Sequence, residues 1–245
     1  MKAYAIINAG GVGKRFGDNT PKQFTYINGR PIIVWCMEQF ERNKNIDYYF
    51  LVMNNITPTI EKQLAEYVEK YKLLKLYDIF EGGETANESR YNGIVGLDKK
   101  YGCIIDKDDI IIFQDVVRLT VKDETINQCI KLANESDVCV TGRSINANLL
   151  GKNAKGDGYN SSYLSSSFNT FLCSMPFAIK FKMGLSMFET AKRNNTLNKN
   201  AGPQGFLKYL DKEVYQLLEI DYFEDFKITY KEDIKILENI WNCQK

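Results

Sequence analysis

The sequence predicts an α/β fold, a Rossmann-like and mostly parallel sheet with helices on both faces and a projecting β-arm. Short apolar, β-branched runs alternate with segments of helical periodicity up to residue 141, as in parallel sheets that are buried on both faces. A long polar segment at about 146–170 then interrupts the alternation. The chain has 245 residues, 44% of them hydrophobic, so we expect a single domain over 1–245 with the arm as an excursion.

The strands and helices are assigned from the period of the apolar residues. Short β-prone runs predict strands over residues 3–9, 48–53, 76–81, 110–114 and 138–141. Helical spacing predicts helices over residues 31–43, 57–71, 86–97 and 122–133, the first of which begins with a proline. After the interruption we expect a helix over 181–193, strands over 214–220 and 226–229, and a closing helix over 231–241.

Residues 146–170 are rich in Asn, Ser and Gly. They can form a hairpin that turns near residues 155–158, where the sequence reads KGDG. A structureless stretch of this length is unusual inside a compact domain, so the segment is expected to be a projecting arm or a lid. Its apolar residues would stay wet in an isolated hairpin. We therefore expect a homodimer in which two such arms pair.

Composition excludes several classes of partner. Lys and Arg together number 32 and Asp and Glu 31, so the chain has no basic field for a nucleic acid. A stretch of about 20 apolar residues, as a membrane span needs, does not occur. Six cysteines without CxxC or metal-ligand spacing indicate reduced thiols in a cytoplasmic protein.

The sequence contains no histidine. This excludes Ser-His-Asp and Cys-His catalysis and every imidazole base. Any chemistry must come from Lys, Arg and Asp, from backbone amides or from a bound metal. Phosphate transfer suits that inventory, because it needs positioning and charge neutralisation more than proton shuttling.

A glycine-rich loop follows the first predicted strand and reads AGGVGKRFG over residues 9–17. Its glycines free backbone N–H groups to approach an anion, and Lys14 and Arg15 add positive charge. The dinucleotide pattern GxGxxG fails, because its third glycine would stand at position 16. The P-loop pattern fails as well, since Asn8 stands where its first glycine belongs.

Five motifs occur in order over nearly the whole chain: AGGVGKRFG, PKQF at 21–24, GGETANES at 82–89, QDVVRLT at 114–120 and FKITYKED at 226–233. Because of these motifs and their order, the chain resembles the family of methylerythritol-phosphate and ribitol-5-phosphate cytidylyltransferases. The family reads AGGxGxRMG, PKQF, GGxxRxxS, HDAVRP and KIT or KVT before a Glu-Asp pair. Glu84 and Thr85 resemble most the ribitol-phosphate branch.

The resemblance implies a role for each matching position. Arg15, Lys22 and Lys227 would be catalytic, and Asp115 would face Mg²⁺. CTP would be bound by Gly10, Gly11, Gly13, Gly82, Gly83 and Ser89. The acceptor would be bound by Arg118, Ser144 and Thr229. Independently of the resemblance, Asp115 and Arg118 follow a predicted strand at its carboxyl end, where open α/β sheets bind ligands.

The acceptor half departs from the family pattern. Within the HDAVRP motif, Gln114 stands in place of the histidine and Leu119 in place of the proline. Further along the chain, Arg143 and Ser144 stand in place of an Asp-Thr pair. The TPQ element reads Met175-Pro176-Phe177. The motifs on the CTP side are kept better than those on the acceptor side, so the acceptor stays open at this point.

The function that the resemblance implies is transfer of the cytidylyl group of CTP to a small polyol phosphate, with release of pyrophosphate. D-Ribitol 5-phosphate is the favoured acceptor, which would give CDP-ribitol for cell-surface polysaccharide biosynthesis. The alternatives are 2-C-methyl-D-erythritol 4-phosphate, another phosphorylated acceptor with a related nucleotidyltransferase activity, and a catalytically silent nucleotide-binding protein.

Overall fold

The computed structural model describes residues 1–11, 16, 21–145, 149–152, 159–165, 170–211 and 215–243, with the backbone alone at 149–152, 159–165 and 243. Gly13 and Arg15 lie outside the described residues. Among the described helices, none is long and apolar enough to cross a bilayer.

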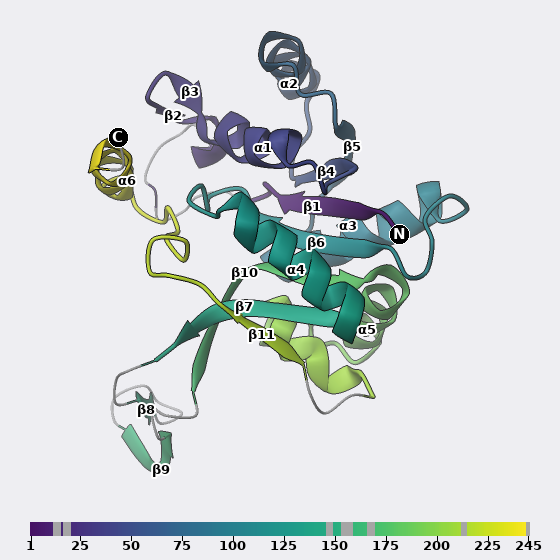
Figure 1. Ribbon diagram of the computed structural model, residues 1–245, viewed down its shortest axis with the longest axis vertical. Coiled ribbons are helices and arrows are strands. Elements are labelled where there is room, and N and C mark those ends of the chain that lie inside the picture. Colours follow the sequence, from purple (N-terminus) through teal and green to yellow (C-terminus); the bar gives the residue numbers. More distant parts are fainter. Residues whose placement is uncertain are drawn as a thin grey trace.

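A seven-stranded sheet forms the centre of the molecule, in the order β11-β7-β10-β6-β1-β4-β5 (Figure 1). All neighbouring strands pair in parallel except β10, which is antiparallel to both β6 and β7. The strands are β1 Ala3–Asn8, β4 Tyr48–Met53, β5 Leu76–Glu81, β6 Ile110–Asp115, β7 Val138–Ser144, β10 Phe171–Lys180 and β11 Gln216–Glu219.

Helices cover both faces of the sheet. They are α1 Ile32–Arg42, α2 Pro58–Tyr71, α3 Ala86–Tyr101, α4 Asp123–Ser136, α5 Phe181–Arg193 and α6 Asp233–Cys243. Alternate residues of one strand face opposite layers, so Ala5 and Ile7 of β1 pack into a core with α1, α2, α4 and α6. Tyr4 and Ile6 pack into a second core with α3 and α5. Burial on both faces explains why the central strands β1, β4 and β6 read as continuous apolar runs.

Two helices begin with a side-chain cap. Thr57 accepts a hydrogen bond from the backbone N of Ile60 at the start of α2. Thr85 and Glu88 form a reciprocal capping box at the start of α3. The box fixes where α3 begins, directly after the loop that contains Gly82 and Gly83.

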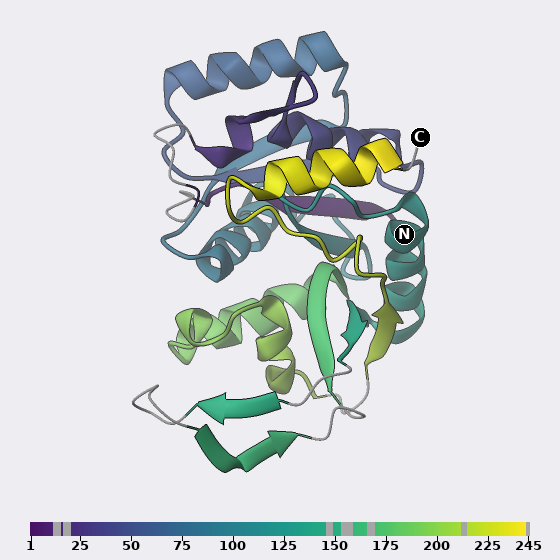
Figure 2. The same ribbon diagram turned by 90° about the vertical axis from the view of Figure 1, so that its left-hand side faces the viewer.

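A two-stranded antiparallel hairpin, β8 Leu149–Lys152 and β9 Tyr159–Ser165, lies between β7 and β10 in the chain. It lies apart from the main sheet, beyond the ends of β7 and β10 (Figures 1 and 2). The fold class is therefore confirmed together with its projecting β-arm. The turn expected near 155–158 lies outside the described residues.

Short elements complete the chain. Two small strands, β2 Tyr26–Ile27 and β3 Arg30–Pro31, form a hairpin just before α1. The 3₁₀-helices in the described part of the chain are η1 Lys22–Phe24, η3 Leu197–Lys199 and η4 Pro203–Tyr209. The first of these carries the PKQF motif, so Lys22 stands at the start of a short, defined turn.

Two expectations about strands were wrong. The first concerns β10, a central strand for which the sequence analysis predicted nothing. Pro176 lies in this strand at an irregularity of its pairing with β7, between Cys173 and Phe177. A proline is tolerated at such a bulge because the regular ladder is already interrupted there.

The second concerns residues 226–229, which are not a strand. Their alternation is real, since Ile228 is buried in the core while Lys227 and Thr229 line a cavity. The segment crosses the end of β6, where the backbone N of Ile228 donates to the carbonyl of Val117. One backbone bond of this kind places the side chains without adding a strand to the sheet.

Candidate active site

The candidate site lies at the carboxyl ends of four parallel strands. Because β1, β4, β5 and β6 run in parallel, the residues that follow them meet at one edge of the sheet. Gly10, Asn54 and Gly82 follow β1, β4 and β5, and Asp115 is the last residue of β6. The topology therefore gathers residues from distant parts of the sequence.

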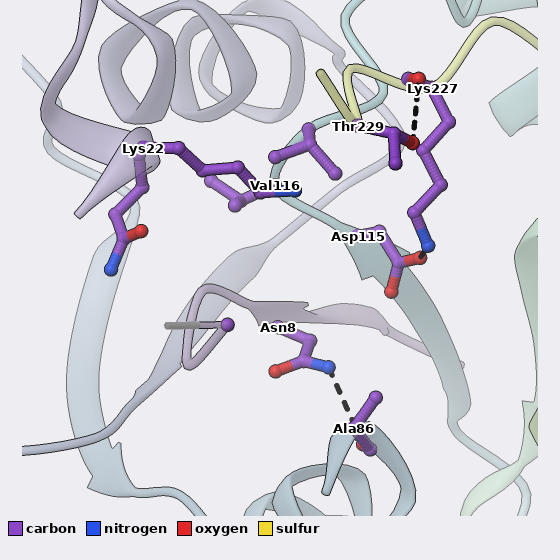
Figure 3. A pocket seen from close by; sticks show the side chains of 10 residues that line it. Asn8, Lys22, Ala86, Asp115, Val116, Lys227 and Thr229 are labelled. Atoms are coloured by element: carbon purple, nitrogen blue, oxygen red, sulfur yellow. Dashed lines mark hydrogen bonds and ion pairs between the residues drawn. The ribbon is translucent and has the colours of Figure 1, made fainter. Parts of the chain in front are cut away.

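A first cavity, of about 310 Å³, opens at this edge. Its lining includes Gly11 from the glycine loop and Lys22 from η1, with Asp115, Lys227 and Thr229 on the other side (Figure 3). The Nζ of Lys22 donates to the carbonyl of Ile228 across 3.1 Å, which ties η1 to the segment that carries Lys227. The PKQF and FKIT motifs thus meet on one cavity, although about 200 positions separate them.

Asp115 lies in a strongly cationic environment. Its Oδ1 accepts from Nη2 of Arg90 at 2.5 Å, and its Oδ2 accepts from Nζ of Lys227 at 2.8 Å. Burial would by itself raise the pKa of Asp115, but the charges of Arg90, Lys227 and Arg118 outweigh it and hold that pKa well below its ordinary value. The carboxylate is therefore ionised at every pH at which the protein would be assayed.

A second cavity, of about 410 Å³, adjoins the first. Both cavities are lined by Ala86, Asp115 and Lys227. The second adds two arginines, Arg90 and Arg118, and a set of uncharged polar side chains: Ser174, Asn200 and Gln204. Two chambers that share a lysine and a carboxylate can bring two ligands together at one point.

Arg118 is held in place by Asp225. Its Nη1 donates to both the carboxylate and the backbone carbonyl of Asp225, with the carboxylate contact at 2.9 Å. The same carboxylate accepts from Oγ of Ser174 and, across 3.1 Å, from Nε of Arg143. The network joins the end of β6, the end of β7, strand β10 and the segment before Lys227, so it fixes the wall of the second cavity.

The loop after β5 lies next to the glycine loop. The backbone N of Gly83 donates to Oγ of Ser89 at 3.0 Å, and Ser89 is buried. A side chain added at Gly10 would come within 3.3 Å of the same hydroxyl. Gly10, Gly82, Gly83 and Ser89, four of the residues predicted to bind CTP, therefore form one cluster.

The model of the family "2-C-methyl-D-erythritol 4-phosphate cytidylyltransferase" (IspD) matches residues 3–147, more than half of the chain. The chain belongs to this family. It is accordingly a CTP-dependent nucleotidyltransferase, and the family uses CTP and a polyol phosphate as substrates.

Relatives carry two different names within the family. A ribitol-5-phosphate cytidylyltransferase of Vibrio parahaemolyticus is 34% identical over 138 residues, 56% of this chain and 55% of that protein. A 2-C-methyl-D-erythritol 4-phosphate cytidylyltransferase of Clostridium botulinum is 28% identical over 242 residues, 98% of this chain and 97% of that protein. The identity of the acceptor is therefore left open by these relatives.

Solved structures of the family have the same fold. The 2-C-methyl-D-erythritol 4-phosphate cytidylyltransferase of Francisella tularensis matches with a TM-score of 0.77 at 20% identity and covers 100% of both chains. The 4-diphosphocytidyl-2C-methyl-D-erythritolsynthase of Anaerococcus prevotii matches with a TM-score of 0.75 at 19% identity, over 100% of this chain and 96% of that one.

Within this family framework, the structure brings most of the predicted site residues together. Those that line one of the two cavities are Gly11, Lys22, Asp115, Arg118, Lys227 and Thr229. Gly10, Gly82, Gly83 and Ser89 form the cluster of the two loops and line neither cavity. Ser144 is different, because it is exposed at the end of β7 and lines neither cavity, and its backbone N donates to Glu219. Gly13 and Arg15 lie outside the described residues.

The departures from the family pattern have different structural consequences. Gln114 is buried and donates from Nε2 to the carbonyl of Arg118 at 3.1 Å, so it supports that arginine from inside the sheet. Met175 lines the second cavity, whereas Phe177 is buried in the core opposite Phe113. Of the two changes in the TPQ element, only the methionine alters the surface of the cavity.

Arg90 is a site residue that the sequence analysis missed. Its side chain is only 3% exposed, and it donates from Nη1 to Oδ1 of Asn87 as well as to Asp115. A signal was present, because Ala86 stands where the GGxxRxxS pattern has arginine and Arg90 follows four positions later. Positions i and i+4 of a helix lie on one face. Arg90 of this chain would therefore reach the same edge of the site as the arginine that the family pattern has at position 86.

Magnesium needs oxygen ligands, commonly one or two carboxylates completed by substrate phosphates. The described residues contain no group of three or more side chains that could hold a metal by themselves. Asp115 lines both cavities, and each of its oxygens accepts from one cation and keeps a further lone pair. The residues therefore fit a magnesium ion only if the triphosphate supplies the other ligands.

Proposed function

We propose that the protein transfers the cytidylyl group of CTP to D-ribitol 5-phosphate, giving CDP-ribitol and pyrophosphate. The observation that carries the proposal is the pair of adjoining cavities that share Asp115 and Lys227. The first would take the triphosphate of CTP beside the glycine loop and Lys22. The second would take the acceptor, with its phosphate toward Arg90, Arg118 and Lys227.

The reaction is an in-line displacement at the α-phosphorus of CTP. An oxygen of the acceptor phosphate forms the new P–O bond, the bond to the bridging oxygen breaks, and its electron pair leaves with pyrophosphate. The attacking phosphate is already anionic at neutral pH, so no general base is required, which agrees with a chain without histidine.

Lysines at the junction of the two cavities would stabilise the transition state. Lys227 is held toward the junction by Asp115, and Lys22 approaches from the opposite wall. Both would neutralise negative charge that develops on the α-phosphate, the kind of preorganised electrostatic stabilisation that lowers a barrier most. Asp115 would also hold Mg²⁺ together with the triphosphate, where the ion would offset the charge of the phosphate oxygens.

The polyol chain would be recognised by the uncharged polar wall of the second cavity. Gln204 donates from Nε2 to the carbonyl of Ser174 at 2.8 Å, which orients its amide along that wall. Ser174, Asn200 and Gln204 offer both donors and acceptors, as a chain of hydroxyl groups requires. The same wall carries Leu172 and Met175, whose apolar surface favours the second candidate, the branched acceptor 2-C-methyl-D-erythritol 4-phosphate.

Pyrophosphate release with CTP and Mg²⁺ tests the assignment. Ribitol 5-phosphate, 2-C-methyl-D-erythritol 4-phosphate and glycerol 3-phosphate should be compared by kcat/KM, with ribitol as a control without phosphate. We expect ribitol 5-phosphate to give the highest value and ribitol none. A higher kcat/KM for 2-C-methyl-D-erythritol 4-phosphate would make that compound the acceptor in place of ribitol 5-phosphate. No turnover with any of the three phosphorylated acceptors would overturn the proposal.

A further inference from the structure

Asn54 lies between the two loops that are predicted to bind the nucleotide. Strand β4 stands between β1 and β5 in the sheet, so its carboxyl end lies between the loops that follow those strands. The backbone N of Ala9 donates to the carbonyl of Val52, and that of Gly82 donates to the carbonyl of Met53. Both loops are thus attached to the end of β4, and Asn54 is the next residue.

The side chain of Asn54 has a fixed orientation. Its Nδ2 donates to the carbonyl of Gly83 at 2.7 Å. A carbonyl oxygen only accepts, so the amide cannot be reversed and Oδ1 must point away from Gly83. Among the described residues no donor reaches Oδ1, although the atom is buried. A buried acceptor without a partner is costly, and such groups in native proteins call for an explanation.

Oδ1 of Asn54 explains why two residues are glycine. A Cβ added at Gly82 would lie 1.9 Å from this oxygen, and one added at Gly10 would lie 2.5 Å from it. Gly29 is the one described glycine with positive φ, so the backbone conformation does not require glycine at positions 10 and 82. The family resemblance assigns Gly82 and Gly83 to the binding of CTP. In the structure, the side chain of Asn54 already occupies the space beside Gly82.

The loop of Gly82 and Gly83 offers acceptors and no free donors. The N–H of Gly82 is bonded to Met53, and that of Gly83 to Oγ of Ser89. The carbonyl oxygen of Gly82 accepts one bond, from Asn92 at 2.9 Å, and keeps a second lone pair. The carbonyl oxygen of Gly83 accepts from Asn54 at 2.7 Å and, more weakly at 3.5 Å, from Oγ of Ser89. A ligand that contacts this loop must therefore present a hydrogen-bond donor to it.

We propose that Asn54 is a positioning residue that locks the Gly82–Gly83 loop with its acceptors toward the base and so selects CTP over UTP. Cytosine carries an amino group at C4, a donor, where uracil carries an oxygen that would face lone pairs. A site built to bond a donor rejects the analogue that lacks it. The inference rests on the proposed cytidylyl transfer and adds the residue that sets its choice of base.

The test measures binding of CTP and UTP by calorimetry without acceptor, in the wild type and in Asn54→Ala. We expect the wild type to bind CTP at least ~10-fold more tightly than UTP. Asn54→Ala should weaken the binding of CTP by ~10-fold and that of UTP by less than ~2-fold, so that the preference for CTP over UTP is lost. The isosteric Asn54→Asp places an oxygen against the carbonyl of Gly83 and should remove the preference as well.

A second pair of variants tests the contact with the glycine. Gly82→Ala should lose CTP binding, because its methyl group meets Oδ1 of Asn54. The double variant Gly82→Ala with Asn54→Ala removes that clash and should bind CTP better than Gly82→Ala alone. The matched control is Asn55→Gly, since Asn55 is exposed with φ of 55° and glycine accepts that conformation.

The outcomes separate the two claims. If the wild type binds neither nucleotide, the proposed function and this inference both fail. If the wild type binds CTP and forms product but Asn54→Ala and Asn54→Asp weaken CTP and UTP equally, or leave both unchanged, Asn54 does not select the base. If the double variant binds CTP no better than Gly82→Ala does, the side chain of Asn54 is not the reason for glycine at position 82.

Discussion

Arg90 and Asp115 form a buried ion pair at the junction of the two cavities, with Nη2 and Oδ1 2.5 Å apart and side chains 3% and 9% exposed. The pair joins the first turns of α3 to the end of β6, two elements whose loops would hold different ligands. Its burial makes the contact both a structural link and a determinant of charge in the site.

Arg90→Met removes the guanidinium at similar volume and leaves Asp115 with Lys227 as its remaining close cation. Breaking a buried pair on one side typically costs about 3 kcal/mol or more, so the free energy of unfolding in urea should fall by about that amount. Arg42→Met is the control, because Arg42 is 58% exposed and its pair with Asp123 spans 3.7 Å. It should change stability by less than about 0.5 kcal/mol. Equal losses in both variants would contradict the account of the buried pair.

The pH dependence of stability follows from the lowered pKa of Asp115. An aspartate in an unfolded chain has a pKa of about 3.9. In the folded protein the charges of Arg90, Lys227 and Arg118 outweigh the effect of burial and hold the pKa of Asp115 below that value. Its contribution is complete above the unfolded pKa and is lost as the pH falls through the folded pKa. The difference in unfolding free energy between the wild type and Asp115→Asn should be constant from pH 5 to 8 and shrink below about pH 4. A difference that already declines between pH 7 and 5 would show that Asp115 titrates normally.

Lys22→Ala should reduce kcat by roughly 100-fold or more, the usual effect of losing one preorganised charge on a transition state. Lys22 lies in a short turn at the edge of the first cavity, so the fold should tolerate its truncation. Thermal unfolding of the variant monitors this point. Lys62→Ala, an exposed lysine of α2, provides the comparison for a lysine remote from the cavities. A folded Lys22→Ala protein with kcat near that of the wild type would remove Lys22 from the mechanism.

Deleting residues 148–168 and closing the gap with a short glycine turn tests the role of the arm. The hairpin of β8 and β9 lies apart from the main sheet, so we predict that the core folds without it and that a dimer becomes a monomer. Light scattering reports the mass, and kcat/KM for the acceptor reports any loss at the site. A wild type that is monomeric, or a shortened protein that remains dimeric with unchanged acceptor kinetics, would refute the prediction.

The sequence was sufficient for the parallel part of the sheet because its signals are local. Strand β5 and helix α5 occupy the predicted residues, since the spacing of their apolar residues marks each of them. Strand β10 was missed because Pro176 in its middle is acceptable only at a bulge, which depends on the neighbouring strand. Residues 226–229 were assigned as a strand because core-facing and cavity-facing side chains alternate there. Phe226 is partly buried and Ile228 fully buried, but the segment has no pairing partner in the sheet.

The site was predictable where a motif carries it and obscure where a contact crosses the fold. Lys22 and Asp115 stand in motifs and line the first cavity. Asp225 and Ser174 belong to no motif, and they meet only because β10 and the segment before Lys227 come together in space. Asn54 is one asparagine among many in the sequence, and its role depends on the two loops on either side of it.

Mass analysis of the nucleotide product tests the central claim most directly. The wild-type protein should be incubated with CTP, Mg²⁺ and ribitol 5-phosphate, and in parallel with UTP, ATP or GTP in place of CTP. The account predicts CDP-ribitol and an equal amount of pyrophosphate with CTP, and little product with the other three. The absence of CDP-ribitol, with pyrophosphate released in comparable amounts from another nucleoside triphosphate, would contradict it.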